Sequence, residues 1–149
     1  TIYRHFENRE ALLSALLLET KRDLLDRLAS AAQNEEPETA LRAGIRSFAL
    51  VCERFGSLTE ALFAGRLEHL HGGHAEFTEM LAKILKRGID EGGFRADLDV
   101  PAAVSMLEGA FMSGAFLRLA RERSFHLAAD SIAEIFLRAC RKGDKEPTR

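Results

Sequence analysis

Three histidines that stand close together in the chain are the residues whose types and spacing could do metal chemistry. His69, His71 and His74 lie near Glu68, and imidazole and carboxylate groups can ligate zinc or nickel. Their spacing crosses a predicted helix end and a glycine pair, and it matches none of the usual zinc motifs. We therefore expect solvated loop histidines with no metal, and a metal-dependent enzyme is the weaker alternative.

Catalysis by side chains alone has less support. No nucleophile and base stand at a spacing typical of an active site, and no loop is suited to hold a phosphate or an oxyanion. Cys52 and Cys140 both fall in apolar periodic segments, which is typical of small core residues in a reduced, cytoplasmic protein. The sequence therefore predicts no enzyme, no cofactor and no disulfide.

Large soft side chains with a few polar groups among them indicate the binding of a mostly apolar small molecule. For any single member, an ordinary core position is the simpler interpretation. Together the residues also suit an apolar cavity with a few groups that orient a ligand. The candidate ligand-binding residues are Phe48, Cys52, Phe55, Phe63, Arg66, His69, Phe77, Met80, Glu108, Phe111, Met112, Ser113 and Phe116.

Helices are the elements that must position these residues. From Arg9 to about Ala32, apolar residues recur at three- and four-residue spacings, and Asn8 is suited to cap the helix start. Further helices are predicted over 37–55, 58–70, 74–91, 101–123 and 126–142, with Gly56-Ser57 as one of the breaks between them. The segment Asp97 to Asp99 is expected to cap the helix that begins at 101. No strand-like alternation or internal repeat occurs. The sequence thus predicts an all-α bundle of about six helices.

Length and charge set limits on the partners. A chain of 149 residues can bury a sizeable core as one domain. Its formal net charge of −2 does not supply the positive field with which a domain grips many phosphates, so we expect the chain alone to bind DNA weakly. The longest apolar runs are far shorter than the ~20 residues that cross a bilayer, and no membrane partner is expected.

Two segments resemble the TetR family of transcriptional regulators. The first, Thr1–Leu13, reads Thr-Ile-Tyr-Arg-His-Phe-Glu-Asn-Arg-Glu-Ala-Leu-Leu. It is similar to the family pattern Thr-aliphatic-Tyr-x-His-Phe, a small or polar residue, a basic residue and Glu-x-Leu-Leu, which joins the recognition helix to the long helix between head and body. The second, Gly88–Asp99, resembles the segment before the family's dimerisation helices, although Val100 here precedes the usual proline.

The resemblance implies a ligand-responsive, DNA-binding regulator, in the simplest case a repressor, with a TetR-like ligand-binding and dimerisation domain. Residues 1–8 would end the recognition helix, residues 9–142 would form that domain, and residues 143–149 would be a tail. The rest of the DNA-binding head is expected before Thr1. The last helices, over about 101–142, would pair with their copies in a homodimer. A helical interaction module without a ligand is the alternative, and it would expose a large apolar groove.

The same resemblance places Thr1, Tyr3, His5 and Arg9 on the phosphate backbone of a double-stranded DNA operator. Hydroxyl, phenol and imidazole groups can contact phosphate oxygens, and Arg9 adds its charge to the positive end of a helix dipole. Packing against the next helix explains Tyr3 equally well and explains Phe6 better.

Replacing both Tyr3 and Arg9 with alanine in the full-length regulator is expected to weaken operator binding, because two backbone contacts would be lost. A gel-shift titration measures the effect. An unchanged DNA affinity would contradict the assignment.

Overall fold

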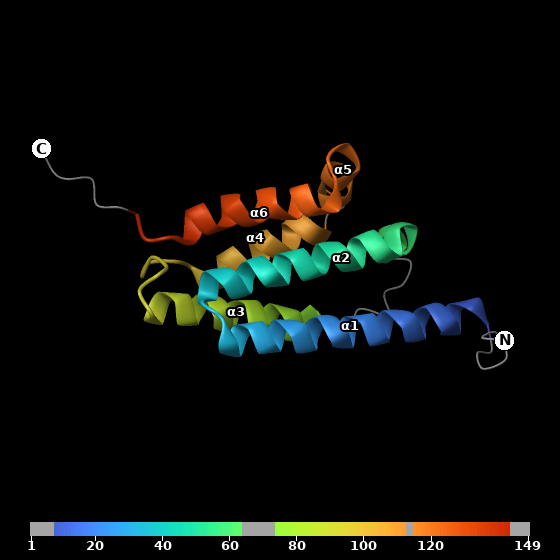
Figure 1. The fold of residues 1–149 in the computed structure, drawn as a ribbon, viewed down its shortest axis with the longest axis horizontal. Coiled ribbons are helices and arrows are strands. Elements are labelled where there is room, and N and C mark those ends of the chain that lie inside the picture. Colours follow the sequence, from blue (N-terminus) through green and yellow to red (C-terminus); the bar gives the residue numbers. More distant parts are fainter. Residues whose placement is uncertain (1–7, 64–73, 113–114, 144–149) are drawn as a thin grey trace, which may run out of the picture.

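Helices make up most of the residues that the computed structural model describes, which are 8–63, 74–112 and 115–143. The helices are α1 (Arg9–Asn34), α2 (Pro37–Phe63), α3 (His74–Asp90), α4 (Val100–Met112), α5 (Ala115–Glu122) and α6 (Phe125–Cys140), as Figure 1 shows. Within these ranges, backbone pairing of the β type is limited to an isolated bridge between Phe94 and Arg141. The all-α prediction is confirmed.

Short polar side chains fix where three of the helices begin. The Oδ1 atom of Asn8 accepts a hydrogen bond from the Ala11 N–H at 2.8 Å, and Asp99 does the same for Ala102 at 3.0 Å. Both caps were predicted from the sequence. The cap of α6 is Ser124, whose Oγ accepts from the Leu127 N–H at 3.2 Å, so this helix begins one residue earlier than the predicted His126. Each such cap is worth about 1 kcal/mol.

The end of the second helix differs from the prediction. The pair Gly56-Ser57 was expected to stop it, whereas α2 continues through this pair to Phe63. Glycine inside a helix costs only ~1 kcal/mol relative to alanine, and ending the helix there would leave backbone groups unpaired. A separate helix starting at Leu58 is therefore wrong, and the remainder of the predicted 58–70 helix extends beyond the described residues.

The predicted single helix over 101–123 is also wrong, because α4 ends at Met112 and α5 begins at Ala115. The sequence at the break is Ser113-Gly114, two residues that favour the helix less than alanine does. Within the described part of the chain, no single helix is long and apolar enough to cross a membrane, and only α4 and α5 taken as one bent pair reach that length and composition. Both contribute buried side chains to the core, such as Leu107, Phe111 and Phe116.

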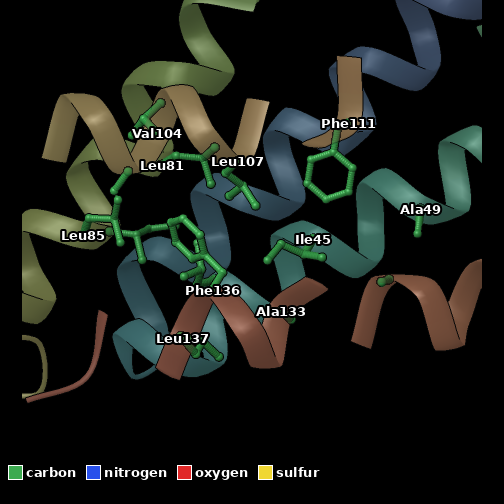
Figure 2. Packing of buried hydrophobic residues seen from close by; sticks show 14 of the residues in the cluster. Ile45, Ala49, Leu81, Leu85, Val104, Leu107, Phe111, Ala133, Phe136 and Leu137 are labelled. Atoms are coloured by element: carbon green, nitrogen blue, oxygen red, sulfur yellow. The ribbon is translucent and has the colours of Figure 1, made fainter. Parts of the chain in front are cut away.

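Helix α2 lies at the centre of the bundle, where it packs against α1, α3 and α6. Its buried residues recur every three or four positions, and they are Ala40, Leu41, Ile45, Ala49 and Cys52. Figure 2 shows Ile45 of this stripe among buried side chains of α3, α4 and α6, including Leu81, Leu107 and Phe136. Burying each large apolar side chain contributes roughly 1.5–3 kcal/mol, so this core is the main source of stability.

Ion pairs along the outer surface join α2 to α6. The Arg42 Nη2 atom lies 2.6 Å from Glu134 Oε2, and Arg46 Nε lies 2.7 Å from Asp130 Oδ1. Hydrogen bonds from Arg42 and then Arg138 lower the pKa of Glu134 to about 2. Because this pKa lies below its value in the unfolded chain, the stabilisation is present above about pH 4.5 and is lost as the pH falls toward 2.

The turn between α3 and α4 is folded tightly against the ends of α3 and α6. Gly92 has a φ of +77°, a conformation that favours glycine. The Phe94 N–H donates to the Gly88 carbonyl at 2.9 Å, and the Arg95 N–H donates to the Cys140 carbonyl at 2.9 Å. The turn thus connects two helix ends that are about 50 residues apart in sequence.

Replacing Gly88 with alanine should destabilise the protein by roughly 1–3 kcal/mol, because overpacking a tight contact forces its neighbours to shift. The added Cβ would lie 2.2 Å from Cδ2 of the buried Phe94 ring. Gly109→Ala is the matched control, since a Cβ there meets no atom within 4 Å, and it should stabilise α4 by about 0.5–1 kcal/mol. Urea denaturation measures both, and equal stability of the two variants would show that the Gly88 contact is not tight.

Candidate functional site

Five phenylalanine rings meet in the interior, one from each helix from α2 to α6. We call Phe48, Phe77, Phe111, Phe116 and Phe125 the aromatic cluster. The ring centroid of Phe48 lies 4.6 Å from that of Phe111 and 6.0 Å from that of Phe77. Phe116 lies 5.1 Å from Phe111 and 6.0 Å from Phe125, in edge-to-face arrangements. Tilted and edge-to-face geometries are the favoured ones for aromatic pairs.

The aromatic cluster has a sealed part and a more accessible part. Phe111 and Phe116 are each only 1% exposed, whereas Phe48, Phe77 and Phe125 are half-buried. In Figure 2, Phe111 points from α4 toward α2. Such rings offer dispersion contacts and π faces to an apolar molecule, and no acid or base chemistry. Four of the five were predicted for ligand binding, and Phe125 was missed.

Cys52 and Met80 lie beside this cluster in sequence and in the core. Cys52 follows Phe48 by one helical turn and is fully buried, and burial raises the pKa of its thiol to about 12. Met80 is partly buried against the core, one turn after Phe77. A protonated, buried thiol is a poor nucleophile, so Cys52 is suited to packing or to soft contact with a ligand.

A polar pair joins α3 to α4 next to the aromatic residues. The Thr78 hydroxyl donates a short hydrogen bond to Oε1 of the partly buried Glu108. Thr78 follows Phe77 directly, and Glu108 precedes Phe111 by three residues, so the carboxylate is oriented near the cluster by a neighbouring helix. Glu108 was predicted as a ligand-binding residue. Thr78 was missed because nothing in its own sequence context indicates a partner 30 residues away.

Several candidate residues fall outside what the structure describes. The ligand-binding candidates of this kind are Arg66, His69 and Ser113, together with the side chains of Phe55, Phe63 and Met112. The proposed DNA contacts Thr1, Tyr3 and His5 and the histidines His69 and His71 also fall outside. Arg9 is the first residue of α1 and His74 is the first residue of α3, but their side chains are not described.

An open groove of about 430 Å³ runs between α1 and α3 on the surface. It is lined by Leu18, Lys21, Arg22, Leu25, Asp26, Glu76, Glu79, Met80 and Lys83. Opposite charges neutralise part of this lining, since Lys83 Nζ lies 2.9 Å from Glu79 Oε1. Sequence reasoning missed the groove, because its two walls lie more than 40 residues apart in the chain.

Large apolar side chains are exposed on the later helices. Met106 of α4 is 72% exposed, Ile135 of α6 is 72% exposed and Leu127 of α6 is 58% exposed. Their neighbours Ala102 and Ala139 are exposed as well. Large exposed apolar side chains that form one patch commonly mark a surface that another protein chain covers.

Comparison of the chain with family models, with curated proteins and with solved structures finds no match. A function for the chain is therefore argued from its own residues.

Proposed function

We propose that this chain is the ligand-sensing, dimer-forming body of a TetR-type transcriptional regulator, which binds operator DNA through the DNA-binding head of the full-length regulator. The observation that supports the proposal most is the aromatic cluster, in which five consecutive helices each contribute one ring. A ligand that displaced one of these rings would contact several helices at once. It can therefore favour one arrangement of the body over another.

The effector that suits this site is mostly apolar, with a flat or aromatic body and one hydrogen-bond donor. Rings whose centroids lie 4.6–6.0 Å apart are in direct contact, so an aromatic guest would have to displace one of them, and it would offer the remaining rings the same surface chemistry. The Glu108 carboxylate, which already accepts from Thr78, is the described polar acceptor nearest in sequence to Phe111. Small-molecule sites typically combine an apolar lining with a few such polar groups that fix orientation.

Effector binding would act on DNA affinity through α1, the helix that the Thr1–Leu13 resemblance places between head and body. Helix α1 packs against α2 and α3, and these carry the Phe48 and Phe77 rings. The effector can shift the equilibrium only by the difference between its affinities for the two arrangements. A typical coupling of about 1–3 kcal/mol changes operator affinity roughly 5- to 150-fold.

A homodimer through the later helices accounts for the exposed apolar residues. Met106, Leu127 and Ile135 are the most exposed of the large apolar side chains that the structure describes. A second copy of the chain carries the same surface, so a two-fold axis would cover both at once. The same exposure would also serve an interaction module that binds a different protein, and the oligomeric state distinguishes the two.

Small molecules that occupy the aromatic cluster should raise the melting temperature, because a ligand at 100 times its Kd stabilises the folded state by about 2.7 kcal/mol. Phe48→Leu keeps much of the volume but removes a ring, and it should weaken binding about threefold to tenfold. Leu50→Ala, at an exposed position of the same helix, should not. A thermal-shift screen followed by calorimetry measures this, and the same molecule should change the gel shift of the full-length regulator. A screen without ligands, together with an experimental structure solidly packed around Phe48, would overturn the proposal.

The chain should be a dimer at micromolar concentration, and Met106→Glu and Ile135→Glu should each weaken the dimer by at least about tenfold, since a desolvated charge costs more than ~1.4 kcal/mol. Leu18→Glu is the matched control, because Leu18 is 54% exposed on α1 and should leave the mass unchanged. Light scattering gives the mass, and circular dichroism checks the fold. If the unsubstituted chain is a monomer at this concentration, the proposed dimer is wrong.

A further inference from the structure

The C-terminal end of α1 lacks a positive partner within its own sequence. Its last turn contains no basic residue, and Glu35 and Glu36 follow directly. The last carbonyls of a helix have no partners within the helix, and they form the negative end of its dipole. Of these, the Ala31 carbonyl accepts from the Glu35 N–H at 3.0 Å. Two carboxylates beside this end make a cation from elsewhere favourable.

Arg87 of α3 supplies that cation across the bundle. Its Nη1 donates to the Ala32 carbonyl and its Nη2 donates to the Glu35 carbonyl, both through short hydrogen bonds. Its Nε lies 3.3 Å from Glu91 Oε1, an ion-pair contact without hydrogen-bond geometry. The guanidinium is planar, and its donors stand in a fixed fork, so two simultaneous contacts fix both the position and the direction of the α1 end.

The backbone that carries Arg87 is itself held tightly. The next residue, Gly88, is covered by the Phe94 ring, and its carbonyl accepts from the Phe94 N–H at 2.9 Å. The residue after Phe94 donates its N–H to the carbonyl of Cys140 at the end of α6. The end of α3, the turn 91–99 and the end of α6 thus form one connected unit, and Arg87 projects from it to α1.

Buried side chains hold the C-terminal half of α1 to the body. Among the described side chains of this helix, the buried ones are Leu24, Leu28 and Ala31, all in its C-terminal half. Nearer the start of the helix, Leu16 is 39% exposed and Leu18 is 54% exposed. In its C-terminal half, α1 is therefore held both by these buried residues and by the directional hydrogen bonds of Arg87.

We infer that Arg87 is the positioning residue that couples α1 to the unit formed by α3, the turn and α6. By capping α1 from a different helix, it transmits displacement of that unit to α1. This coupling is a property of the fold and stands independently of the proposed function. If the proposed function holds, the coupling also gives a route from the effector to the DNA-binding head.

Hydrogen exchange of the backbone amides at 31–36 tests the anchor, because fraying of the last turn of α1 exposes them to solvent. Arg87→Met should accelerate their exchange about tenfold or more. Arg87→Lys keeps the charge but not the fork, and it should give an intermediate effect. Arg27→Met is the matched control, since Arg27 pairs with Asp23 on the exposed surface of the same helix and should leave exchange at 31–36 unchanged. If Arg87→Met leaves the exchange rates at 31–36 unchanged, Arg87 does not hold the end of α1.

A double-mutant cycle tests the coupling. Phe94→Leu loosens the turn and should accelerate exchange at 31–36 while Arg87 is present. In the Arg87→Lys background, Phe94→Leu should accelerate this exchange only slightly further, because the hydrogen bonds between residue 87 and α1 are already weakened. An equal acceleration by Phe94→Leu in both backgrounds would overturn the coupling. Urea denaturation of each variant separates local opening from loss of global stability. No DNA or effector is used, so failure here is distinguishable from failure of the proposed regulator.

Discussion

Close approach of neighbouring helices to α2 is the constraint on which the rest of the structure depends. Small residues on α2 make it possible: Gly44 faces α1 so closely that a Cβ would lie 2.7 Å from Leu28 Cδ1, and Ala40 and Ala49 are buried on the same helix. The facing surface of α6 is also small, with buried Ala128, Ala129 and Ala133. Gly44 leaves room for Leu28 of α1, and the alanines of α2 and α6 leave room for their larger neighbours such as Ile45 and Leu137. Large side chains fill the space toward α3, α4 and α5, where the aromatic cluster lies.

Packing and charge have different parts in holding α6 to α2. The buried apolar residues contribute roughly 1.5–3 kcal/mol each when large, whereas a partly exposed ion pair contributes about 0–1 kcal/mol. The core therefore determines that the two helices associate. The pairs Arg42–Glu134 and Arg46–Asp130 are spaced by one turn on each helix, so sliding one helix along the other would break both. These two ion pairs therefore favour one register of α6 against α2, whereas the small alanine side chains alone would allow several registers.

Features encoded by neighbouring residues could be predicted from the sequence, and features encoded by distant residues could not. The amphipathic spacing of α1, α3 and α6 and the caps Asn8 and Asp99 depend on a few adjacent residues, and the structure confirms them. The continuation of α2 through Gly56-Ser57 was not predictable, because a glycine signals only a modest local cost. For the site, the aromatic side chains of Phe48, Phe77, Phe111 and Phe116 were predicted to line it. That Phe125 joins them was not predicted. The Thr78–Glu108 pair and the Arg87 cap depend on contacts 30 and more residues apart.

The lack of aromatic residues in α1 decides how a change in the cluster can reach that helix. Since α1 carries no ring, an effect of the cluster reaches it through neighbouring helices, of which α2 and α3 make the largest described contacts with α1. The contact with α2, where Leu28 lies over Gly44, is apolar and tolerates small sliding movements with gradual loss of dispersion energy. The contact with α3 includes the Arg87 fork, which is directional and either forms or breaks. Hydrogen bonds to charged groups contribute about 1.5–3 kcal/mol, which is the same order as a typical coupling energy between sites. The hydrogen bonds of this single residue are therefore comparable in energy to the coupling between two sites.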